Sequence, residues 1–115
     1  MKETIKSIID WHETTFPDAT LEAQIEKFYN EHSEFVETDR TDIMELADML
    51  IVACGIARFD LLSAAFCFSM CQKEFEASKS DDIDIVSLAK AIDDKMQTNR
   101  ERTWNFENGQ YQHKE

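Results

Sequence analysis

The chain has 115 residues, of which 43% are hydrophobic, so it is long enough for one domain with a modest core and too apolar to be disordered throughout. Its formal net charge of −12 leaves little basic surface for a nucleic-acid backbone, which argues against nucleic acid as a partner. With only 2 Gly and 1 Pro, the composition favours long helices over many short strands. We therefore expect a single all-α domain over residues 1–115.

No part of the sequence is typical of export or of membrane insertion. The longest apolar stretch, Met49–Ala57, is far shorter than the about 20 residues of a membrane span, and the N-terminal segment lacks the apolar run of a signal peptide. Cys54, Cys67 and Cys71 lie in apolar surroundings without CxxC spacing, which indicates buried free thiols in a reducing cytoplasm. A metal clip at Cys67 and Cys71 is the less favoured alternative. We expect a soluble, cytoplasmic protein with no membrane partner.

The first two helices are predicted from apolar residues that recur at helical spacing. The first covers residues 2–14 and ends before Pro17, because the residue before a proline avoids helical torsions. The second follows at once and places an apolar stripe along residues 21–35. His12 and His32 lie on these apolar faces, so we interpret both as structural residues rather than as metal ligands.

Two pairs of carboxylates flank a short polar turn at residues 38–41. Glu31 and Glu34 precede the turn, and each pair is spaced by three, which places its members on one face of a helix. Glu31 is as far from the middle of the turn as Asp48 is. Glu34 and Glu45 are likewise equidistant from it. In an antiparallel hairpin, with helix axes roughly 8–10 Å apart, all four carboxylates would meet between the helices.

Four unpaired carboxylates at one height would repel one another and raise each other's pKa. Hard divalent cations with oxygen ligands relieve that repulsion, so we predict a Mg²⁺ site between the paired helices, with Mn²⁺ as an alternative ion. A solvated acidic face is the other reading in a chain this acidic. A di-iron centre would need Glu-x-x-His pairs, but Glu34 and Asp48 stand where the histidines would be, so iron is disfavoured.

The third and fourth helices are unusually apolar. The third is apolar on every side over residues 49–57, and a helix of that kind is buried all round. The fourth, with Asp60 as its cap, is again apolar almost throughout residues 61–71. Two such helices exceed what one core of this size needs. We therefore expect a subunit interface around Ile51 and Phe66, and a homodimer or homotetramer.

The fifth helix, which follows a polar linker over residues 78–84, ends in the densest basic patch of the chain. Lys95, Asn99 and Arg102 stand four and three apart, so a helix that continues to Arg102 would align them on one face. Carboxylates that hold a metal ion, together with basic groups from a distant segment, suit phosphate chemistry. In such sites the metal neutralises phosphate oxygens, and Lys and Arg stabilise the charge on the leaving group.

The C-terminal segment contains one candidate for stacking on a base. Trp104 has that capacity, although a lone Trp near a C-terminus more often packs against its own fold. Asn108-Gly109 marks a turn, and we expect the tail from about residue 107 to be mobile.

The carboxylate motif resembles that of a known family. Glu31-x-x-Glu34 and then Glu45-x-x-Asp48, on a predicted helical hairpin, resemble the ExxE…ExxD metal motif of the MazG-like all-α nucleoside triphosphate pyrophosphohydrolases. Two flanking motifs are similar to a phage and bacterial branch known as dATP/dGTP diphosphohydrolases: Trp11-His12-x-x-x-Phe16-Pro17 and Lys95-Met96-x-x-Asn99-x-x-Arg102-x-Trp104. Members of this branch often end in a Gly followed shortly by a His, as in Gly109 and His113. The resemblance covers nearly the whole chain.

The resemblance implies a MazG-like bundle of four to five helices and a Mg²⁺-dependent enzyme, with dimers or tetramers. The expected reaction cleaves a nucleoside triphosphate, with a purine deoxynucleotide preferred, between the α and β phosphates to give the monophosphate and pyrophosphate. The implied metal ligands are Glu31, Glu34, Glu45 and Asp48. One of these carboxylates, or a hydroxide on the metal, would be the base for the attacking water. The implied phosphate or sugar contacts are Lys95, Asn99 and Arg102. Weaker candidates, on the same side as Glu31, are Gln24 and Lys27.

A non-catalytic, acidic helical binding protein for a basic partner is the alternative function. It would account for the net charge of −12. It would not explain the mirrored carboxylate spacing or the basic patch before Trp104.

Overall fold

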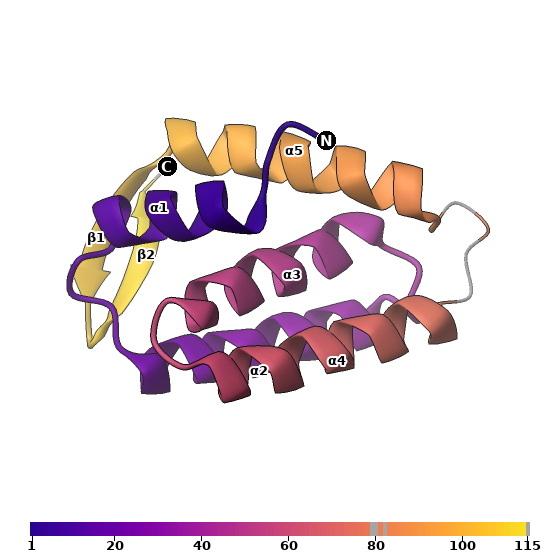
Figure 1. The fold of residues 1–115 in the computed structure, drawn as a ribbon, viewed down its shortest axis with the longest axis horizontal. Coiled ribbons are helices and arrows are strands. Elements are labelled where there is room, and N and C mark those ends of the chain that lie inside the picture. The colour runs from indigo at the N-terminus through magenta and orange to yellow at the C-terminus, as the bar shows by residue number, and fades with distance from the viewer. Residues whose placement is uncertain (79–80, 82, 115) are drawn as a thin grey trace.

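The computed structural model describes residues 1–78, 81 and 83–114, which form a helical bundle with one two-stranded sheet (Figure 1). The helices are α1 (Ile5–Thr15), α2 (Leu21–Glu37), α3 (Ile43–Ala57), α4 (Leu61–Ala77) and α5 (Ile85–Glu101). The strands are β1 (Thr103–Glu107) and β2 (Gln110–Lys114). The helical bundle confirms the coarse expectation, whereas the sheet was not expected. None of the described helices has the length and hydropathy needed to cross a membrane.

Each helix begins at a residue whose side chain accepts a hydrogen bond from a backbone N–H of the first turn. These caps are Thr4, Thr20, Asp42, Asp60 and Asp84. Such bonds satisfy donors that have no partner inside the helix, which is why the short polar side chains set the helix starts. The expected cap at Asp60 is confirmed.

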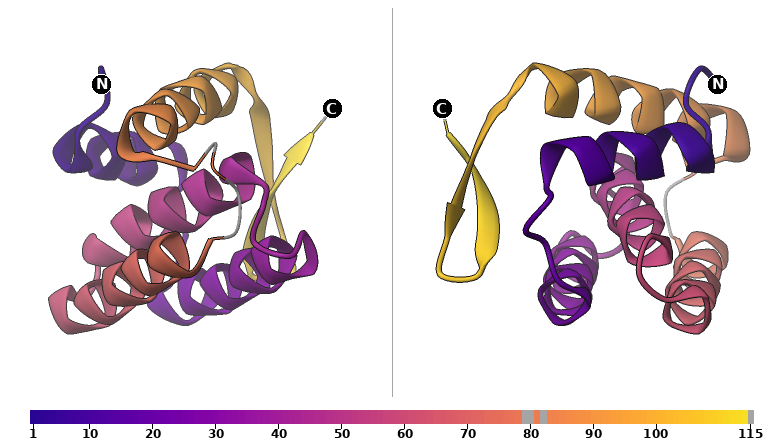
Figure 2. Two further views of the ribbon diagram at one scale, coloured as in Figure 1. Left: turned by 90° about the vertical axis from the view of Figure 1, so that its right-hand side faces the viewer. Right: turned by 60° about the vertical axis from the view of Figure 1, so that its left-hand side comes forward.

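α3 lies at the centre of the bundle, between α1 and α5 on one side and α2 and α4 on the other (Figures 1 and 2). It is buried on all sides, as its composition predicted. However, the cover comes from the same chain, and the expected subunit interface at Ile51 is wrong. Ile51 is 6% exposed and belongs to a core cluster with Ile8 of α1 and Met96 of α5. α1 and α5, which are distant from α3 in the sequence, cover the face of α3 that we expected a second subunit to cover.

The three cysteines are buried and free, as predicted. Burial raises the pKa of Cys54 and Cys71 to about 12, so both thiols stay protonated near neutral pH. Among the described residues, the one group of side chains with the geometry to hold a metal ion contains no cysteine. The structure therefore gives no support for a metal site at Cys67 and Cys71.

His32 has a polar environment rather than the apolar one we expected. Its Nε2 lies 2.6 Å from Oε2 of Glu74, and Nε of Arg40 donates to the other oxygen of that carboxylate at 2.9 Å. His32 is only partly buried, whereas Glu74 is 7% exposed. The three side chains therefore link α2 and the turn after it to α4.

The C-terminal segment forms an antiparallel hairpin where we expected a mobile tail. β1 pairs with β2 from Thr103 opposite Lys114 to Glu107 opposite Gln110. The turn at Asn108-Gly109 is confirmed, with φ of 53° and 80°, the left-handed pair that a two-residue type I′ turn requires. α5 also ends at Glu101, so the expected helix does not continue to Arg102, whose backbone is extended.

Candidate functional site

The mirrored carboxylates meet where α2 packs against α3. Oxygens of Glu31, Glu45 and Asp48 all lie within 4.8 Å of one another. Glu34 lies on the exposed side of this cluster and contacts both Glu31 and Glu45. The structure thus brings all four residues together, as the equal spacing from the turn predicted.

The conformation of the turn explains why carboxylates at equal distances from it face each other. Asp39 and Arg40 have φ of 57° and 58°, and two left-handed residues in succession reverse the chain within a few residues. The N–H groups of Asp39 and Arg40 donate to the carbonyls of Val36 and Phe35, which closes the end of α2. α3 then starts at once after its cap at Asp42, so few residues separate the two acidic faces.

The cluster holds negative charge that the protein does not fully compensate. Burial, followed by the charge of Asp48, raises the pKa of Glu31 to about 8. Burial also raises the pKa of Glu45 and of Asp48, although Lys95 partly opposes the shift at Asp48. Glu31 Oε2 and Glu45 Oε2 are buried and have no hydrogen-bond partner among the described residues. A buried polar atom without a partner is costly, so these oxygens are suited to an external cation.

The donor set fits a hard divalent cation. Carboxylate oxygens from Glu31, Glu45 and Asp48 converge, and Mg²⁺ and Mn²⁺ prefer such ligands. Glu34 lies at the edge, where it would complete the set or orient a water molecule. Within the described ranges, no second group of three His, Cys, Asp or Glu side chains has comparable geometry.

We expect the metal-free protein to be destabilised by Glu31 as the pH rises from about 4.5 to 8. A carboxyl group with a raised pKa binds its proton more tightly in the folded state, so its contribution is zero below its ordinary value of 4.5 and increasingly unfavourable up to about pH 8. Thermal melts with a chelator should therefore show Glu31→Gln more stable than wild type at pH 8 and equally stable near pH 4. Mg²⁺ should raise the wild-type Tm most at pH 8. Equal melting of the two proteins at both pH values would contradict this reading.

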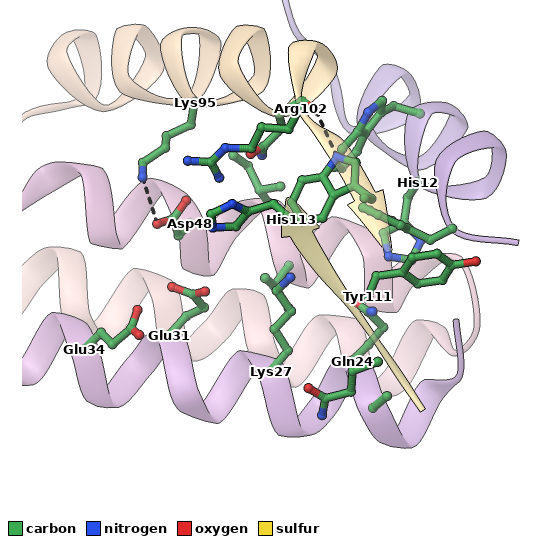
Figure 3. A pocket seen from close by; sticks show the side chains of 18 residues that line it. His12, Gln24, Lys27, Glu31, Glu34, Asp48, Lys95, Arg102, Tyr111 and His113 are labelled. Carbon is green, nitrogen blue, oxygen red and sulfur yellow. Dashed lines mark hydrogen bonds and ion pairs between the residues drawn. The ribbon is translucent and has the colours of Figure 1, made fainter. Parts of the chain in front are cut away.

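A cavity of about 300 Å³ extends from the carboxylates to the C-terminal hairpin (Figure 3). Glu31 and Glu34 lie at one end, and His12 and Tyr111 lie at the other. All six residues predicted from sequence as substrate contacts line it: Gln24, Lys27, Lys95, Asn99, Arg102 and Trp104. Glu31, Glu34 and Asp48 line its acidic end, so metal ligands and cations face one space.

The three cationic side chains of the cavity differ in their partners. Lys95 Nζ lies 3.1 Å from Asp48 Oδ2. Lys27 Nζ lies 5.4 Å from the ring centroid of Trp104, and burial lowers the pKa of Lys27 although Glu31 opposes the shift. Arg102 is exposed, and its side chain forms no hydrogen bond or ion pair with any residue that the structure describes. Its guanidinium is therefore free to bind a ligand.

The sequence interpretation missed the aromatic end of the cavity. Trp11, Tyr111 and His113 line it in addition to Trp104. Trp104 packs against its own fold as well, since its Nε1 donates to the Asn99 carbonyl at 3.2 Å and its ring lies 6.3 Å from that of Trp11. The available signal was the Asn-Gly pair between two segments with aromatic residues at alternate positions, which is typical of a hairpin.

No protein-family model, no curated protein and no solved structure matches this chain. The likeness of its motifs to the MazG-like enzymes therefore stays a prediction. The function has to be inferred from the geometry and the chemistry of the site.

Proposed function

We propose that this protein is a MazG-like, Mg²⁺-dependent nucleoside triphosphate pyrophosphohydrolase that acts on a purine deoxynucleoside triphosphate. One observation carries the proposal: the oxygens of Glu31, Glu45 and Asp48 converge, and Glu31 and Asp48 of this group line a cavity together with three cationic side chains. A triphosphate needs both kinds of group. Divalent cations bind its oxygens, and Lys or Arg stabilises the charge that develops on the leaving phosphates.

The carboxylates and the cationic side chains would have different roles in the reaction. Glu31, Glu45 and Asp48 would hold Mg²⁺, with Glu34 beside them, and the ion would polarise phosphate oxygens and activate water. The bond between the α and β phosphates breaks, a water molecule supplies the new oxygen, and its proton passes to one of the carboxylates. Lys95 and Arg102 would contact the phosphates, and the planar fork of Arg would offer two parallel hydrogen bonds.

Pyrophosphate release from a panel of the common ribo- and deoxyribonucleoside triphosphates tests this proposal. We expect turnover with Mg²⁺ and none with a chelator, with a purine deoxynucleotide as the best substrate. The absence of both turnover and nucleotide binding would favour the acidic binding protein instead. That alternative fits the net charge but gives no reason for buried, unpartnered carboxylate oxygens beside cations.

We also expect a homodimer or homotetramer in which α4 forms the interface. Leu62 and Phe66 stand four apart on α4 and are 82% and 58% exposed, next to an exposed Leu61. Neighbouring exposed apolar side chains of this size mark interaction surfaces. Light scattering at micromolar concentration should show an oligomer, and Leu62→Glu should dissociate it. Gln72→Glu, an exposed change on the same helix, serves as the control. A monomeric wild type would refute the expectation.

A further inference from the structure

Arg58 fixes the hydrogen-bonding roles of the ring nitrogens of His12, a residue that lines the cavity. Its Nδ1 lies 3.1 Å from Nη1 of Arg58, which also donates to the Phe16 carbonyl at 2.8 Å. A guanidinium group only donates, so Nδ1 must accept. Burial lowers the pKa of His12 to about 4, and the neutral ring therefore carries its proton on Nε2.

The Nε2 donor is buried against Gly55 and beside Gln24, so it does not itself reach a ligand in the cavity. His12 is 4% exposed, and its Nε2 forms no well-formed hydrogen bond with the described chain. Gln24, which is 8% exposed, lies beside it and lines the same cavity. Oε1 of Gln24 and Nε2 of His12 both lie beside Gly55, and the Gln24 side chain interacts with the His12 ring. With its carbonyl oxygen turned to His12, Gln24 has its amide NH₂ left to donate to a ligand in the cavity, and an unpaired buried N–H is costly.

Gly55 of α3 makes room for this arrangement. A Cβ atom at this position would lie 2.8 Å from Cδ2 and from Nε2 of His12, and 3.3 Å from Oε1 of Gln24. Contacts this short force the ring or the backbone to move. The absence of a side chain on α3 is therefore what allows the His12 ring to sit against the helix.

The walls around the donor suit a flat ring. Trp11, Phe16, Trp104 and Tyr111 line the same cavity, and Figure 3 shows His12 and Tyr111 at the end opposite to Glu31 and Glu34. Aromatic faces stack on heteroaromatic bases. A nucleotide whose phosphates meet the carboxylates and cations would extend its base toward this end.

We propose that the aromatic end binds the nucleobase through a carbonyl oxygen, and that Arg58, His12 and Gln24 together select guanine over adenine. The inference rests on the proposed function, which places the phosphates at the carboxylates. Guanine has an acceptor at the position where adenine has an amino group. A donor facing that amino group would lose its hydrogen bond, and sites built to read a polar group discriminate strongly against analogues that cannot pair.

Binding of monophosphates, measured by isothermal titration calorimetry with Mg²⁺, tests this inference without any turnover. dIMP carries the carbonyl of guanine but lacks its amino group, so it isolates the predicted contact. We expect dGMP and dIMP to bind at least about 10-fold more tightly than dAMP. His12→Phe and Gly55→Ala should bring the three affinities close together, whereas Gln97→Leu, an exposed change outside the cavity, should leave the ratio intact.

The outcomes separate this inference from the proposed function. If dGMP and dIMP are preferred but no triphosphate is cleaved, the base site stands and the hydrolase proposal fails. If triphosphates are cleaved while dAMP binds as tightly as dGMP, the base site is wrong and the hydrolase proposal stands. Should His12→Phe fail to fold, Gln24→Glu provides the second variant, because a carboxylate in place of the amide lacks the NH₂ donor and should remove the preference. Retention of the preference in a folded Gln24→Glu protein would overturn the inference, and so would the absence of binding by all three monophosphates.

Discussion

Glu45→Gln should abolish pyrophosphate release and leave the helical circular dichroism unchanged. Glu45 supplies one of the three converging oxygens, and its Oε2 is buried without a partner among the described residues. Glutamine keeps the shape but loses the negative charge that holds a divalent cation. Because the metal would stabilise much of the charge in the transition state, we expect a loss of roughly 1,000-fold or more.

The same variant should be more stable than wild type when metal is absent. Burial, together with the charges of Asp48 and Glu34, raises the pKa of Glu45, so the ionised group destabilises the metal-free fold at neutral pH. Glu37→Gln, an exposed change on α2, is the matched control for both measurements. Pyrophosphate release at the wild-type rate in Glu45→Gln would rule out the metal-hydrolase function.

Arg102→Ala should lower kcat/KM by roughly 30- to 1,000-fold with little change in Tm. A phosphate contact that strengthens in the transition state contributes about 2–4 kcal/mol by analogy with an oxyanion donor, at about 1.4 kcal/mol per factor of ten. The side chain lines the cavity and has no partner in the described part of the chain, so its loss removes nothing that stabilises the fold. Arg102→Lys should recover only part of the activity, because a point charge lacks the bidentate fork.

Arg100 provides a control from the same helix end. Its Nη2 donates to Oε1 of Glu3 at 2.7 Å, on a surface that does not line the cavity. Arg100→Ala should therefore affect activity little and should at most change stability slightly, as expected for an exposed ion pair. If Arg102→Ala and Arg100→Ala had equal, near wild-type kinetics, our placement of the phosphates would be incorrect.

The carboxylate cluster could be predicted from sequence because it depends on local rules. Helical spacing places Glu31 and Glu34 on one face, and a short turn reverses the chain. Counting residues from that turn then determines which carboxylates face each other. No knowledge of the rest of the bundle is needed, and the cap at Asp60 is local in the same sense.

The cover of α3 and the aromatic end of the cavity depend on contacts between distant segments. Apolar periodicity indicates that Ile51 is buried, but it does not specify whether α1, α5 or a second subunit covers it. The hairpin pairs Phe16 with Tyr111 at a centroid distance of 4.7 Å, across most of the chain. The ring nitrogen of His12 that carries the proton likewise depends on Arg58, which lies 46 residues away in the sequence. Pattern and spacing do not contain this information.

The identity of the products formed from dGTP tests the central claim most directly. Purified protein with Mg²⁺ should convert dGTP to dGMP and pyrophosphate in equal amounts, and a chelator or Glu45→Gln should abolish both products. Formation of dGDP and phosphate, or the absence of cleavage of every nucleoside triphosphate, would contradict the proposed pyrophosphohydrolase.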